Sequence, residues 1–421
     1  MKGSVFIMAR TKKYLQFGIM QRIYQGSGCI QMIPNILETE GWKRVMVIAD
    51  PGLNKAGLIK PFEELLKNAG VDYVVFDHVR PNPETITIDG EAIPLYHEFK
   101  ADVMLAVGGG STMDTAKGVA IVGDSGKKVM DFIGIPPQVP LKHKTYPIIA
   151  VPSTAGTGSD VCRNAVICDE QGYKLVPSHD CILPAYAVLD PDILASQPPK
   201  VAAPTAFDAL THALESYTNM NANDFTELFS LHSLELIGES IRPYVANPAV
   251  DEYANKMSLA CMYAGFSLGI ASIGQDHVLT HPMGEEPTHM THGDACAMAL
   301  PAVIEWNGLG CKEKYRKAYN ALSKKNVSVG DFEVKMLIDW IIELIRDLQL
   351  FDLKDFEEFG YNSGDVKTEM LKHPILAKKD QIANADCAYP RVTRIRDFGY
   401  LLDRTNYWSK VIKGEIPYQL G

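Results

Sequence analysis

The sequence predicts an α/β protein whose first half builds a mostly parallel β-sheet flanked by helices and whose second half is entirely helical. Short runs of β-branched and other apolar residues alternate with helical stretches through the first half, which is typical of a parallel sheet. Consecutive prolines at Pro198 and Pro199 then mark a connection. Beyond them, apolar residues recur at the helical spacing i, i+3, i+4. We therefore expect two domains, 1–197 and 198–421.

The expected elements follow in order along the chain. In the first domain, strands are predicted at 45–49, 73–76, 103–107 and 147–151, and helices at 54–69, 88–99 and 112–120. In the second domain, the apolar spacing predicts long helices at 203–220, 225–244, 251–268 and 332–348. Strand-like runs disappear from this half of the chain.

Composition narrows the class of protein. The 421 residues are 46% hydrophobic and 22% charged, values typical of a globular protein. The formal net charge is −10, which disfavours adhesion to nucleic acid or to an anionic membrane. No run approaches the roughly 18 apolar residues that indicate a membrane span. We expect neither nucleic acid nor membrane as a partner.

Cysteine usage indicates the compartment. The eight cysteines are scattered and form no C-x-x-C pair, which in a chain of this length suggests free thiols in a reducing environment. Residues 1–20 contain lysines and arginines but no apolar segment of signal-peptide length. The expected location is cytoplasmic.

Histidines cluster in one part of the second domain. Four of the eleven, at positions 277, 281, 289 and 292, fall within sixteen residues. Asp208 and His212 are four apart on an expected helix, so both side chains leave the same face. An isolated pair of this kind is usually a surface contact or a core histidine. A carboxylate with several imidazoles on separate helices instead favours a divalent ion such as Fe(II) or Zn(II).

Two glycine-containing loops follow strands of the first domain. Gly108, Gly109, Gly110 and Ser111 come directly after the 103–107 strand and open a helix. Backbone N–H groups in such a turn approach a phosphate closely, and the helix N-terminus favours the anion. The alternative is a tight turn without a ligand. A second loop rich in hydroxyls and glycine, 152–159, follows the next strand and makes a dinucleotide cradle the better interpretation.

Asp50 stands at the end of the first predicted strand. Its carboxylate is suited to bind an adenosine ribose diol and to repel the extra phosphate of NADP, which predicts NAD as the cofactor. It could equally be a helix cap. Asp50 lies 58 positions before Gly108, whereas the usual fingerprint places its acidic residue about 20 positions after the glycines. Either the nucleotide fold is wound differently or Asp50 has no such role.

The ordered motifs resemble a known family over essentially the whole chain. They comprise Pro81-Asn82-Pro83, the segment from Gly108 to Lys117, Thr154 to Ser159, Asp208 to Glu215, His277 to Gly284, His292-Gly293 and Tyr389-Pro390-Arg391. In these segments the chain resembles the iron-containing (group III) alcohol dehydrogenases. The resemblance implies a dehydroquinate synthase-like fold: an N-terminal domain that binds NAD(P), an all-helical C-terminal domain that holds one divalent ion, and a cleft between them.

The resemblance also assigns residues. It implies that Asp208, His212, His277 and His292 bind the ion, and that His281 lies near the metal and nicotinamide as a catalytic proton relay or as a packing neighbour of His277. The expected cofactor-binding residues are Asp50, Gly108, Gly109, Gly110, Ser111, Asp114, Ser153, Thr154, Thr157, Val166 and Lys174.

Some residues depart from the family pattern. The loop between Gly284 and His292 is one residue longer than in close relatives and contains Glu285, Glu286 and an extra His289, so substrate contacts are not carried across it. Asp160 replaces a glutamate, and Ala206 replaces a glycine two residues before Asp208. Neither change removes an expected ligand.

The resulting hypothesis is hydride transfer between NAD(H) and a small primary alcohol or polar aldehyde, with a divalent ion lowering the pKa of the hydroxyl. By resemblance the chain forms a homodimer or a larger homo-oligomer. A lyase of the dehydroquinate synthase type would need Lys and Arg to hold a phosphorylated acid, and the stretch from His277 to His292 has none. A third alternative is a scaffold with a structural ion. Such ions usually have cysteine ligands, and the expected ligand set contains none.

Overall fold

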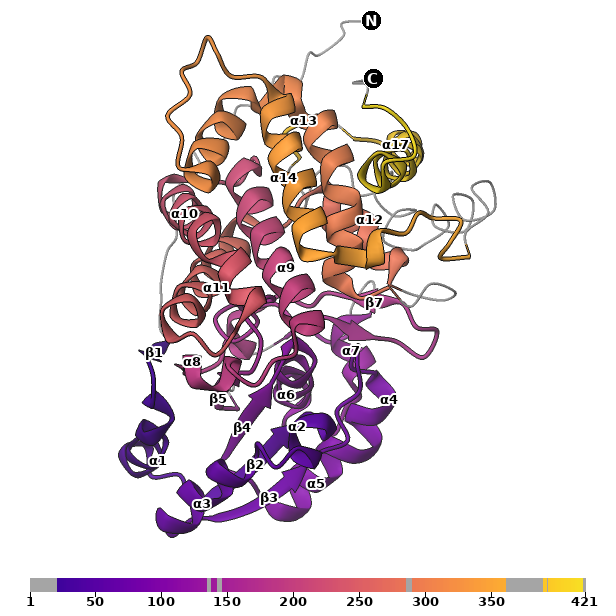
Figure 1. The fold of residues 1–421 in the computed structure, drawn as a ribbon. Helices are drawn as coiled ribbons and strands as arrows, with labels where there is room; N and C mark the ends of the chain where they lie inside the picture. The colour runs from indigo at the N-terminus through magenta and orange to yellow at the C-terminus, as the bar shows by residue number, and fades with distance from the viewer. Residues whose placement is uncertain are drawn as a thin grey trace, which may run out of the picture.

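The computed structural model describes residues 21–134, 138–141, 146–284, 290–360, 389–391 and 393–418. It consists of an α/β part formed by the first half of the chain and a helical part formed by the second (Figure 1). Among the described residues no strand follows Leu189. The predicted fold class is confirmed. The boundary between residues 197 and 198 stays a prediction, although the first long helix of the helical part, α9 (Pro199–Thr218), begins two residues beyond it.

A six-stranded sheet forms the centre of the α/β part. Its order is β1-β8-β5-β4-β2-β3, and every neighbouring pair is parallel. The strands are β1 (Arg22–Gln25), β2 (Arg44–Ala49), β3 (Asp72–Phe76), β4 (Val103–Gly108), β5 (Ile148–Pro152) and β8 (Tyr186–Leu189). The four predicted strands are present within a residue at either end. β1 and β8 were not predicted; they are four-residue strands that pair with each other from Arg22 opposite Tyr186 to Gln25 opposite Leu189.

Both faces of the sheet are buried against helices. Along β2, Met46 and Ile48 belong to one hydrophobic core, whereas Val45, Val47 and Ala49 belong to the core on the other face. Because successive side chains of a strand point to opposite faces, such a strand is apolar at every position. This continuous apolar character is what made β2, β4 and β5 recognisable in the sequence.

Two of the helices predicted for the α/β part differ from the structure. The expected helix 54–69 is two helices, α2 (Pro51–Lys55) and α3 (Lys60–Asn68). Gly57 separates them with a φ of 76°, a conformation that glycine adopts without steric cost. The expected helix 88–99 is longer and comprises α4 (Thr85–Thr87), η2 (Ile88–Ala92) and α5 (Ile93–Phe99).

The strand order creates a switch point between β2 and β4. The chain leaves β2 for β3 on one side and then crosses to β4 on the other side of β2. Ligands of open α/β sheets bind outside the carboxyl ends of the strands at such a point. Asp50 follows β2 and Gly109 follows β4, so both flank the switch point.

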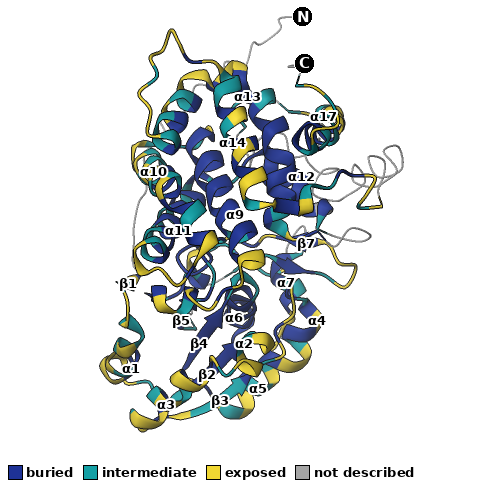
Figure 2. Ribbon diagram, in the orientation of Figure 1, coloured by how far each residue is buried: buried dark blue, intermediate teal, exposed yellow. Residues whose placement is uncertain are grey.

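The helical part encloses the largest core. It contains α9, α10 (Asp224–Ala246), α11 (Asp251–Ala271), α12 (Gln275–Met283), α13 (His292–Ser323), α14 (Val334–Leu348) and α17 (Ile395–Lys413). The four predicted helices correspond to α9, α10, α11 and α14. Buried residues dominate α9, α12 and the middle of α13, which lie at the centre of this part (Figure 2).

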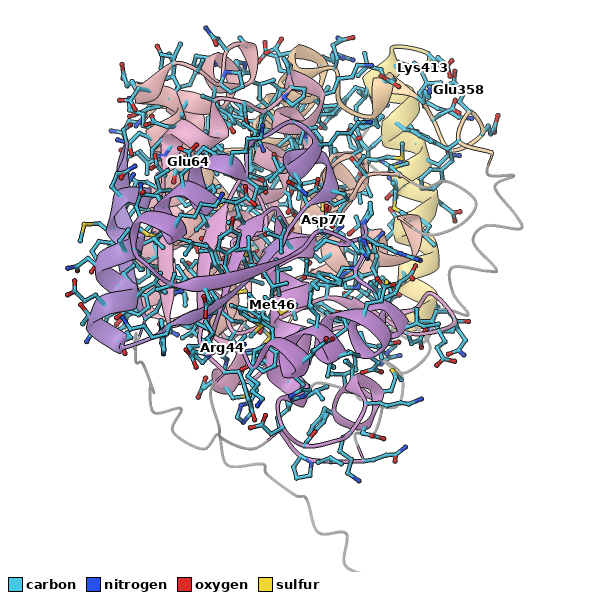
Figure 3. All side chains as sticks on the ribbon, turned by 90° about the horizontal axis from the view of Figure 1, so that it is seen from below. Arg44, Met46, Glu64, Asp77, Glu358 and Lys413 are labelled. Carbon is cyan, nitrogen blue, oxygen red and sulfur yellow. The ribbon has the colours of Figure 1, made fainter. Side chains whose placement is uncertain are left out.

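The last described helix, α17, packs on the outside of the helical part. At its C-terminal end, Lys413 Nζ forms an ion pair of 2.7 Å with Glu358 Oε2. The two side chains lie together in Figure 3. On its inner face, Trp408 is fully buried and donates a hydrogen bond of 2.9 Å to Glu305 of α13.

Two properties bear on the expected environment. Over the described part of the chain, no single helix has the length and apolar character needed to cross a membrane; only the bent pair Asp251–Ala271 and Gln275–His281 meets both criteria when joined, with a 95° bend. The seven cysteines among the described residues are all free thiols.

Candidate active site and metal centre

One carboxylate oxygen lies among three imidazole rings. Oδ1 of Asp208, on α9, is 3.6 Å from Nδ1 of His212, 3.4 Å from Nε2 of His277 on α12 and 3.6 Å from Nε2 of His292 on α13. Asp208, His212 and His277 are buried. The structure therefore brings the four expected ligand residues together from three helices that are far apart in the sequence.

Two glycines allow these helices to approach so closely. A Cβ on Gly293 would lie 1.9 Å from the carbonyl oxygen of Pro204, so only glycine lets the start of α13 rest against α9. A Cβ on Gly274 would lie 2.4 Å from Oε1 of Glu215. Both contacts place the first turn of a histidine-bearing helix against α9.

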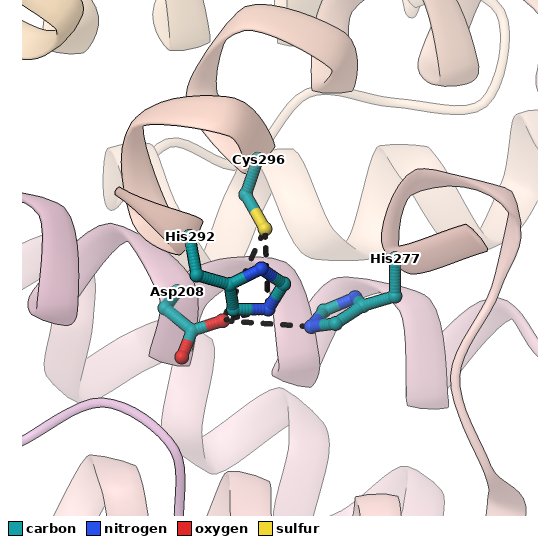
Figure 4. A group of neighbouring side chains, drawn as sticks. All are labelled: Asp208, His277, His292 and Cys296. Atoms are coloured by element: carbon teal, nitrogen blue, oxygen red, sulfur yellow. Dashed lines mark hydrogen bonds and ion pairs between the residues drawn. The ribbon is translucent and has the colours of Figure 1, made fainter. Parts of the chain in front are cut away.

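A cysteine that the sequence analysis did not select joins this cluster. The ligand atoms of Asp208, His277, His292 and Cys296 all lie within 4.8 Å of one another, and the four side chains point toward a common centre (Figure 4). His212 is not part of this tightest group; its ring stacks on that of His277 with centroids 4.3 Å apart. The sequence analysis had placed no cysteine beside the expected ligands, and the ligand assignment itself stays a prediction. Cys296 could have been found, because it lies one helical turn after His292.

Glu215 orients His277 and was also missed. It lies seven residues after Asp208 on the same face of α9. Its Oε2 accepts a hydrogen bond of 2.7 Å from Nδ1 of His277 and one of 3.0 Å from the N–H of Gly274, and its Oε1 accepts one of 2.7 Å from the N–H of Asp276. One carboxylate thus caps α12 and fixes the ring whose other nitrogen faces Asp208.

The cluster fits a divalent cation. Nε2 of His277 is fully buried and has no hydrogen-bond partner, although it lies 3.4 Å from the Asp208 carboxylate. Nδ1 of His212 donates to the carbonyl of Gly156 at 3.4 Å, which leaves its Nε2 as an acceptor. Buried polar atoms without partners are rare in folded proteins, and imidazole, carboxylate and thiol are the ligands of Fe(II) and Zn(II).

Without a cation, the ionisable groups of the cluster perturb one another. Burial acts against the charged form of His277, but the neighbouring carboxylates of Asp208 and Glu215 outweigh it and raise its pKa to about 10. Burial lowers the pKa of His212 to about 4 and that of His292 to about 3. Burial opposes ionisation of Asp208 too, but the neighbouring imidazoles hold its pKa below the ordinary range.

His281 and Asp276 border the cluster on α12. The ring of His281 is buried and its centroid is 6.1 Å from that of His292. Asp276 is fully buried and neither carboxylate oxygen has a hydrogen-bond partner. Burial and the charge of Glu215 raise the pKa of Asp276 well above its ordinary value. Burial and the nearby Asp276 do the same for the thiol of Cys296.

The first glycine loop is built for close approach at the switch point. Gly109, Gly110 and Ser111 are partly accessible and open α6 (Gly110–Val122), whose N-terminus has no side-chain cap. A Cβ on Gly110 would lie 2.7 Å from Cγ2 of Thr157, and one on Gly109 would lie 3.4 Å from Oγ1 of Thr154. The two predicted loops are therefore in contact, with uncapped helix N–H groups that can bind an anion.

The second loop links this cradle to the metal cluster. Ser153 donates its backbone N–H to the carbonyl of Gly108 at 2.9 Å. Three residues later, Gly156 accepts the bond from His212, and a Cβ there would lie 2.7 Å from the carbonyl oxygen of Thr205 on α9. A molecule bound to the glycine loop would therefore lie beside the helix that carries Asp208.

Asp114 has an internal role in the structure. One carboxylate oxygen accepts a hydrogen bond of 2.7 Å from Ser159 and the other accepts one of 2.9 Å from the N–H of Val166. Lys117, one turn further along α6, donates to Ser159 at 2.7 Å and to the carbonyl of Cys162 at 3.0 Å. These two buried residues hold the segment between the second loop and Val166 through hydrogen bonds. Lys117 was not predicted to have this role.

Asp50 caps a helix. Its Oδ1 accepts hydrogen bonds from the N–H groups of Gly52 at 2.7 Å and Leu53 at 3.3 Å. Asp50 is therefore the N-cap of α2, which was the alternative role considered for it. Asp50 nonetheless lies next to the glycine loop, because Ala49 and Val107 are paired across β2 and β4.

Lys174 lies at the metal side of the candidate site. It is buried in β7 (Lys174–Leu175), which pairs with β6 (Ile167–Cys168). A Cβ on Gly284, at the end of α12, would lie 3.0 Å from its Nζ, and its charge contributes to the low pKa of His292. Glu285, Glu286 and His289 lie outside the described residues.

Taken together, an anion-binding loop at the switch point of a parallel sheet and a buried carboxylate–imidazole cluster beside it define a nucleotide- and metal-dependent enzyme. Two family models match the chain: "iron-containing alcohol dehydrogenase" over residues 20–191 and "Fe-containing alcohol dehydrogenase family, C-terminal" over residues 202–385. The chain belongs to the iron-containing alcohol dehydrogenase family.

Individual relatives agree with this placement. The chain is 32% identical to choline dehydrogenase of Bacillus subtilis over 82% of its length and 86% of the relative's, and 30% identical to lactaldehyde reductase of Escherichia coli over 77% and 84%. A solved structure of 1,3-propanediol oxidoreductase superposes with a TM-score of 0.83 at 26% identity, covering 91% of this chain and 97% of that one. The protein is a metal-dependent oxidoreductase acting on CH–OH groups, and the lyase alternative is not favoured.

Proposed function

We propose that the protein transfers hydride between NAD(H) and a small primary alcohol or polar aldehyde, with one divalent ion at the Asp208 cluster. The observation that carries the proposal is the convergence of His212, His277 and His292 within 3.6 Å of one carboxylate oxygen. A bound divalent ion supplies Lewis acidity, which polarises a carbonyl and makes a hydroxyl more acidic. Every other contribution comes from the arrangement of the chain.

The proposed division of labour follows the two loops and three helices. Backbone N–H groups of Gly109, Gly110 and Ser111 hold the pyrophosphate of the cofactor. Thr154 and Thr157 border the same cradle and Asp114 holds the N–H of Val166, so that the nicotinamide end is directed toward α9. Placing the two reacting groups at a fixed distance accounts for a large share of the rate of such reactions.

NAD is the proposed cofactor, and a polar molecule is the proposed substrate. A ribose 2′-phosphate beside Asp50 would bring like charges together at the switch point. Lys174, buried close to Gly284 and His292, gives this side of the site a positive charge. That charge favours substrates that carry a further hydroxyl or carbonyl group besides the reacting one over simple aliphatic alcohols.

His281 is the proposed proton carrier. It follows His277 by one turn of α12, and its ring lies 6.1 Å from that of His292. From that position its imidazole can pass a proton between the substrate oxygen and solvent. The competing role is packing beside His277. A His281→Gln variant that keeps the full rate between pH 6 and pH 9 would favour packing.

We further propose a homodimer or larger homo-oligomer. β1 is a four-residue edge strand of the sheet, and an edge strand presents backbone groups that can pair with a second chain. Light scattering of the purified protein measures the assembly, and a monomer at micromolar concentration would contradict the proposal.

The proposed function is tested by metal analysis and an aldehyde screen. Protein purified without oxygen should contain one Fe(II) or Zn(II) per chain and oxidise NADH when short polar aldehydes are supplied. His277→Ala should lose both the ion and turnover, because it removes a central ligand and leaves Glu215 without its partner. His232→Ala, which changes an exposed histidine on α10, should retain both. A His277→Ala protein with stoichiometric metal and a normal rate would refute the ligand assignment.

A further inference from the structure

One motif found in the sequence, Tyr389-Pro390-Arg391, packs against the middle of α13. The guanidinium carbon of Arg391 lies 3.6 Å from the centre of the Trp306 ring, and Nη1 donates a hydrogen bond of 2.8 Å to the carbonyl of Trp306. A Cβ on Gly310 would lie 3.2 Å from the carbonyl oxygen of Pro390. The motif is therefore fixed on α13, and it brings the chain just beyond it to the start of α12.

The hydroxyl of Thr393 joins three parts of the chain. Its Oγ1 accepts a hydrogen bond of 3.1 Å from Nε1 of Trp306 on α13 and one of 3.1 Å from Nε2 of Gln275 on α12. It donates one of 2.9 Å to the carbonyl of Arg391. Because a hydroxyl has one proton to donate and two lone pairs that accept, all of its hydrogen-bonding positions are used. A valine of the same shape would leave both nitrogen donors without this acceptor.

Gln275 is the residue through which this contact reaches α12. It is the first residue of the helix and is 1% exposed. Its amide exchanges two hydrogen bonds of 3.0 Å with the amide of Asn307 on α13. Glu215 attaches the same turn to α9 through the N–H groups of Gly274 and Asp276. A helix of nine residues depends on tertiary contacts for its position, and Gln275 supplies the contact to α13.

The contact between α12 and α13 bears on the metal site. His277 follows Gln275 by two residues, and His292 is the first residue of α13. The centroids of the two imidazole rings are 5.2 Å apart. Metal–ligand bonds tolerate deviations of only about 0.2 Å. The fit of an ion between these two rings therefore depends on how α12 is held against α13.

We infer that Thr393 is a positioning residue of the metal site: through Gln275 it holds α12 against α13 and so keeps His277 at bonding distance from an ion that His292 also binds. Thr393 acts through its neighbours and is not itself a ligand. The inference rests on the proposed function, because it needs an ion at the Asp208 cluster. It gives a role to the C-terminal segment, which belongs neither to the glycine loops nor to the ligand-bearing helices.

Thr393→Val tests this role with little change of shape. Chelator competition should show Zn(II) binding weakened by about tenfold, the lower end of the effect of residues that orient metal ligands, and kcat should fall. KM for NAD should change by less than about twofold, because the glycine loops are unaltered. Thr393→Ser keeps the hydroxyl and should restore both the Zn(II) affinity and kcat.

Thr405→Val is the matched control. Thr405 is a buried threonine of α17, and its hydroxyl donates to the carbonyl of Leu401 on the same helix at 2.9 Å. The same substitution there should leave the Zn(II) affinity and kcat at their wild-type values. A threonine that contributes only to the stability of the fold would give this result at position 393 as well.

A second measurement follows the network in the wild type. Coupling between two sites is reciprocal, so bound zinc should in turn stabilise the hydrogen bonds of Thr393. Exchange of the Trp306 indole proton, followed by NMR and assigned with Trp306→Phe, should slow by about tenfold when the apoprotein is loaded with Zn(II). The indole proton of Trp408, which is bonded to Glu305 at 2.9 Å, should change by less than about twofold.

The outcomes separate the positioning role from the proposed function. Wild-type Zn(II) affinity in Thr393→Val, a Thr393→Ser variant as weak as Thr393→Val, an equal loss in Thr405→Val, or a Trp306 exchange rate that zinc leaves unchanged would each overturn the positioning role and leave the proposed function intact. A wild type that binds neither Zn(II) nor Fe(II) would overturn both.

Discussion

Glu215 and His277 are 62 residues apart in the chain and are joined by a hydrogen bond of 2.7 Å between Oε2 and Nδ1. The bond holds the imidazole so that Nε2 faces Asp208, and the same carboxylate caps α12 through the N–H groups of Gly274 and Asp276. A single buried side chain thus determines both where α12 begins and how its first histidine is oriented. Outer carboxylates of this kind strengthen metal binding.

Glu215→Gln should weaken metal binding by about 10- to 100-fold. Glutamine has one carbonyl oxygen in place of two carboxylate oxygens, so it cannot accept all three hydrogen bonds, and it removes the negative charge beside His277. Chelator competition with Zn(II) measures the affinity. Glu64→Gln, an exposed residue of α3, serves as the control and should bind like the wild type. Equal affinities of the two variants would contradict the role of Glu215.

Asp50→Ser should shift the cofactor preference toward NADP. Serine preserves the cap of α2, since its hydroxyl accepts from the same N–H groups, but removes the charge that opposes the 2′-phosphate. The ratio of kcat/KM for NADP to that for NAD should rise by about tenfold or more, which corresponds to about 1.4 kcal/mol. A wild type that already prefers NADP, or a ratio unchanged by the substitution, would exclude Asp50 from cofactor choice.

Gly110→Ala should raise KM for NAD more than it lowers kcat. The new Cβ would lie 2.7 Å from Cγ2 and 3.0 Å from Oγ1 of Thr157, and forcing apart two packed groups costs about 1–3 kcal/mol. Adding Thr157→Ser removes the methyl group and should restore part of the lost affinity. Cofactor fluorescence titration of the single and double variants provides the measurement. No recovery in the double variant would show that the clash is not the cause.

Asp160→Asn should stabilise the protein at neutral pH. Burial raises the pKa of Asp160 to about 6, from an ordinary value of 3.8. A carboxyl group whose pKa is raised on folding adds its full share to the free energy of unfolding below pH 3.8, where it is protonated in both states. This share falls as the pH rises to 6. At 1.36 kcal/mol per unit, ionisation costs the folded state about 3 kcal/mol above pH 6.

Denaturant unfolding at several pH values tests this sign. The free energy of unfolding of Asp160→Asn should exceed that of the wild type by an amount that grows from about pH 4 to pH 6 and is constant above. Asp192→Asn, which changes an exposed carboxylate of α8 (Pro191–Leu194), serves as the control and should leave the pH profile as it is in the wild type. A difference that shrinks with rising pH would contradict the assignment.

The sequence predicted the elements that are apolar on both faces or periodic over many residues. β2, β4 and β5 are buried on two faces, and α10 and α14 repeat their apolar spacing over several turns, so local pattern was sufficient. β1 and β8 were missed because each is four residues long and is defined by its partner. The expected 54–69 helix was too long because Gly57, at φ 76°, ends a turn without disturbing the apolar pattern around it.

For the site, motif and spacing selected Asp208, His212, His277 and His292 and both glycine loops. Cys296 was passed over because a cysteine in a helix is usually an apolar core residue. Glu215 and Lys117 were passed over because nothing local distinguishes a carboxylate or ammonium that faces a partner from one that faces solvent. The hydrogen bonds of Asp114 were equally unpredictable from local sequence, because their donors, Ser159 and Val166, lie more than 40 positions further along the chain.

What this sequence determined by itself was chemical identity: which residues carry imidazole, carboxylate and thiol groups, which positions lack a Cβ, and which segments must bury an apolar face. Those properties are local, so periodicity and spacing express them. Only the tertiary structure decided that α9, α12 and α13 meet at one buried point, that the sulfur of Cys296 lies there, and that His212 touches the nucleotide loop. Such contacts depend on the close packing of Gly293 on Pro204 and Gly156 on Thr205, and distances between helices far apart in the chain are set by packing rather than by sequence order.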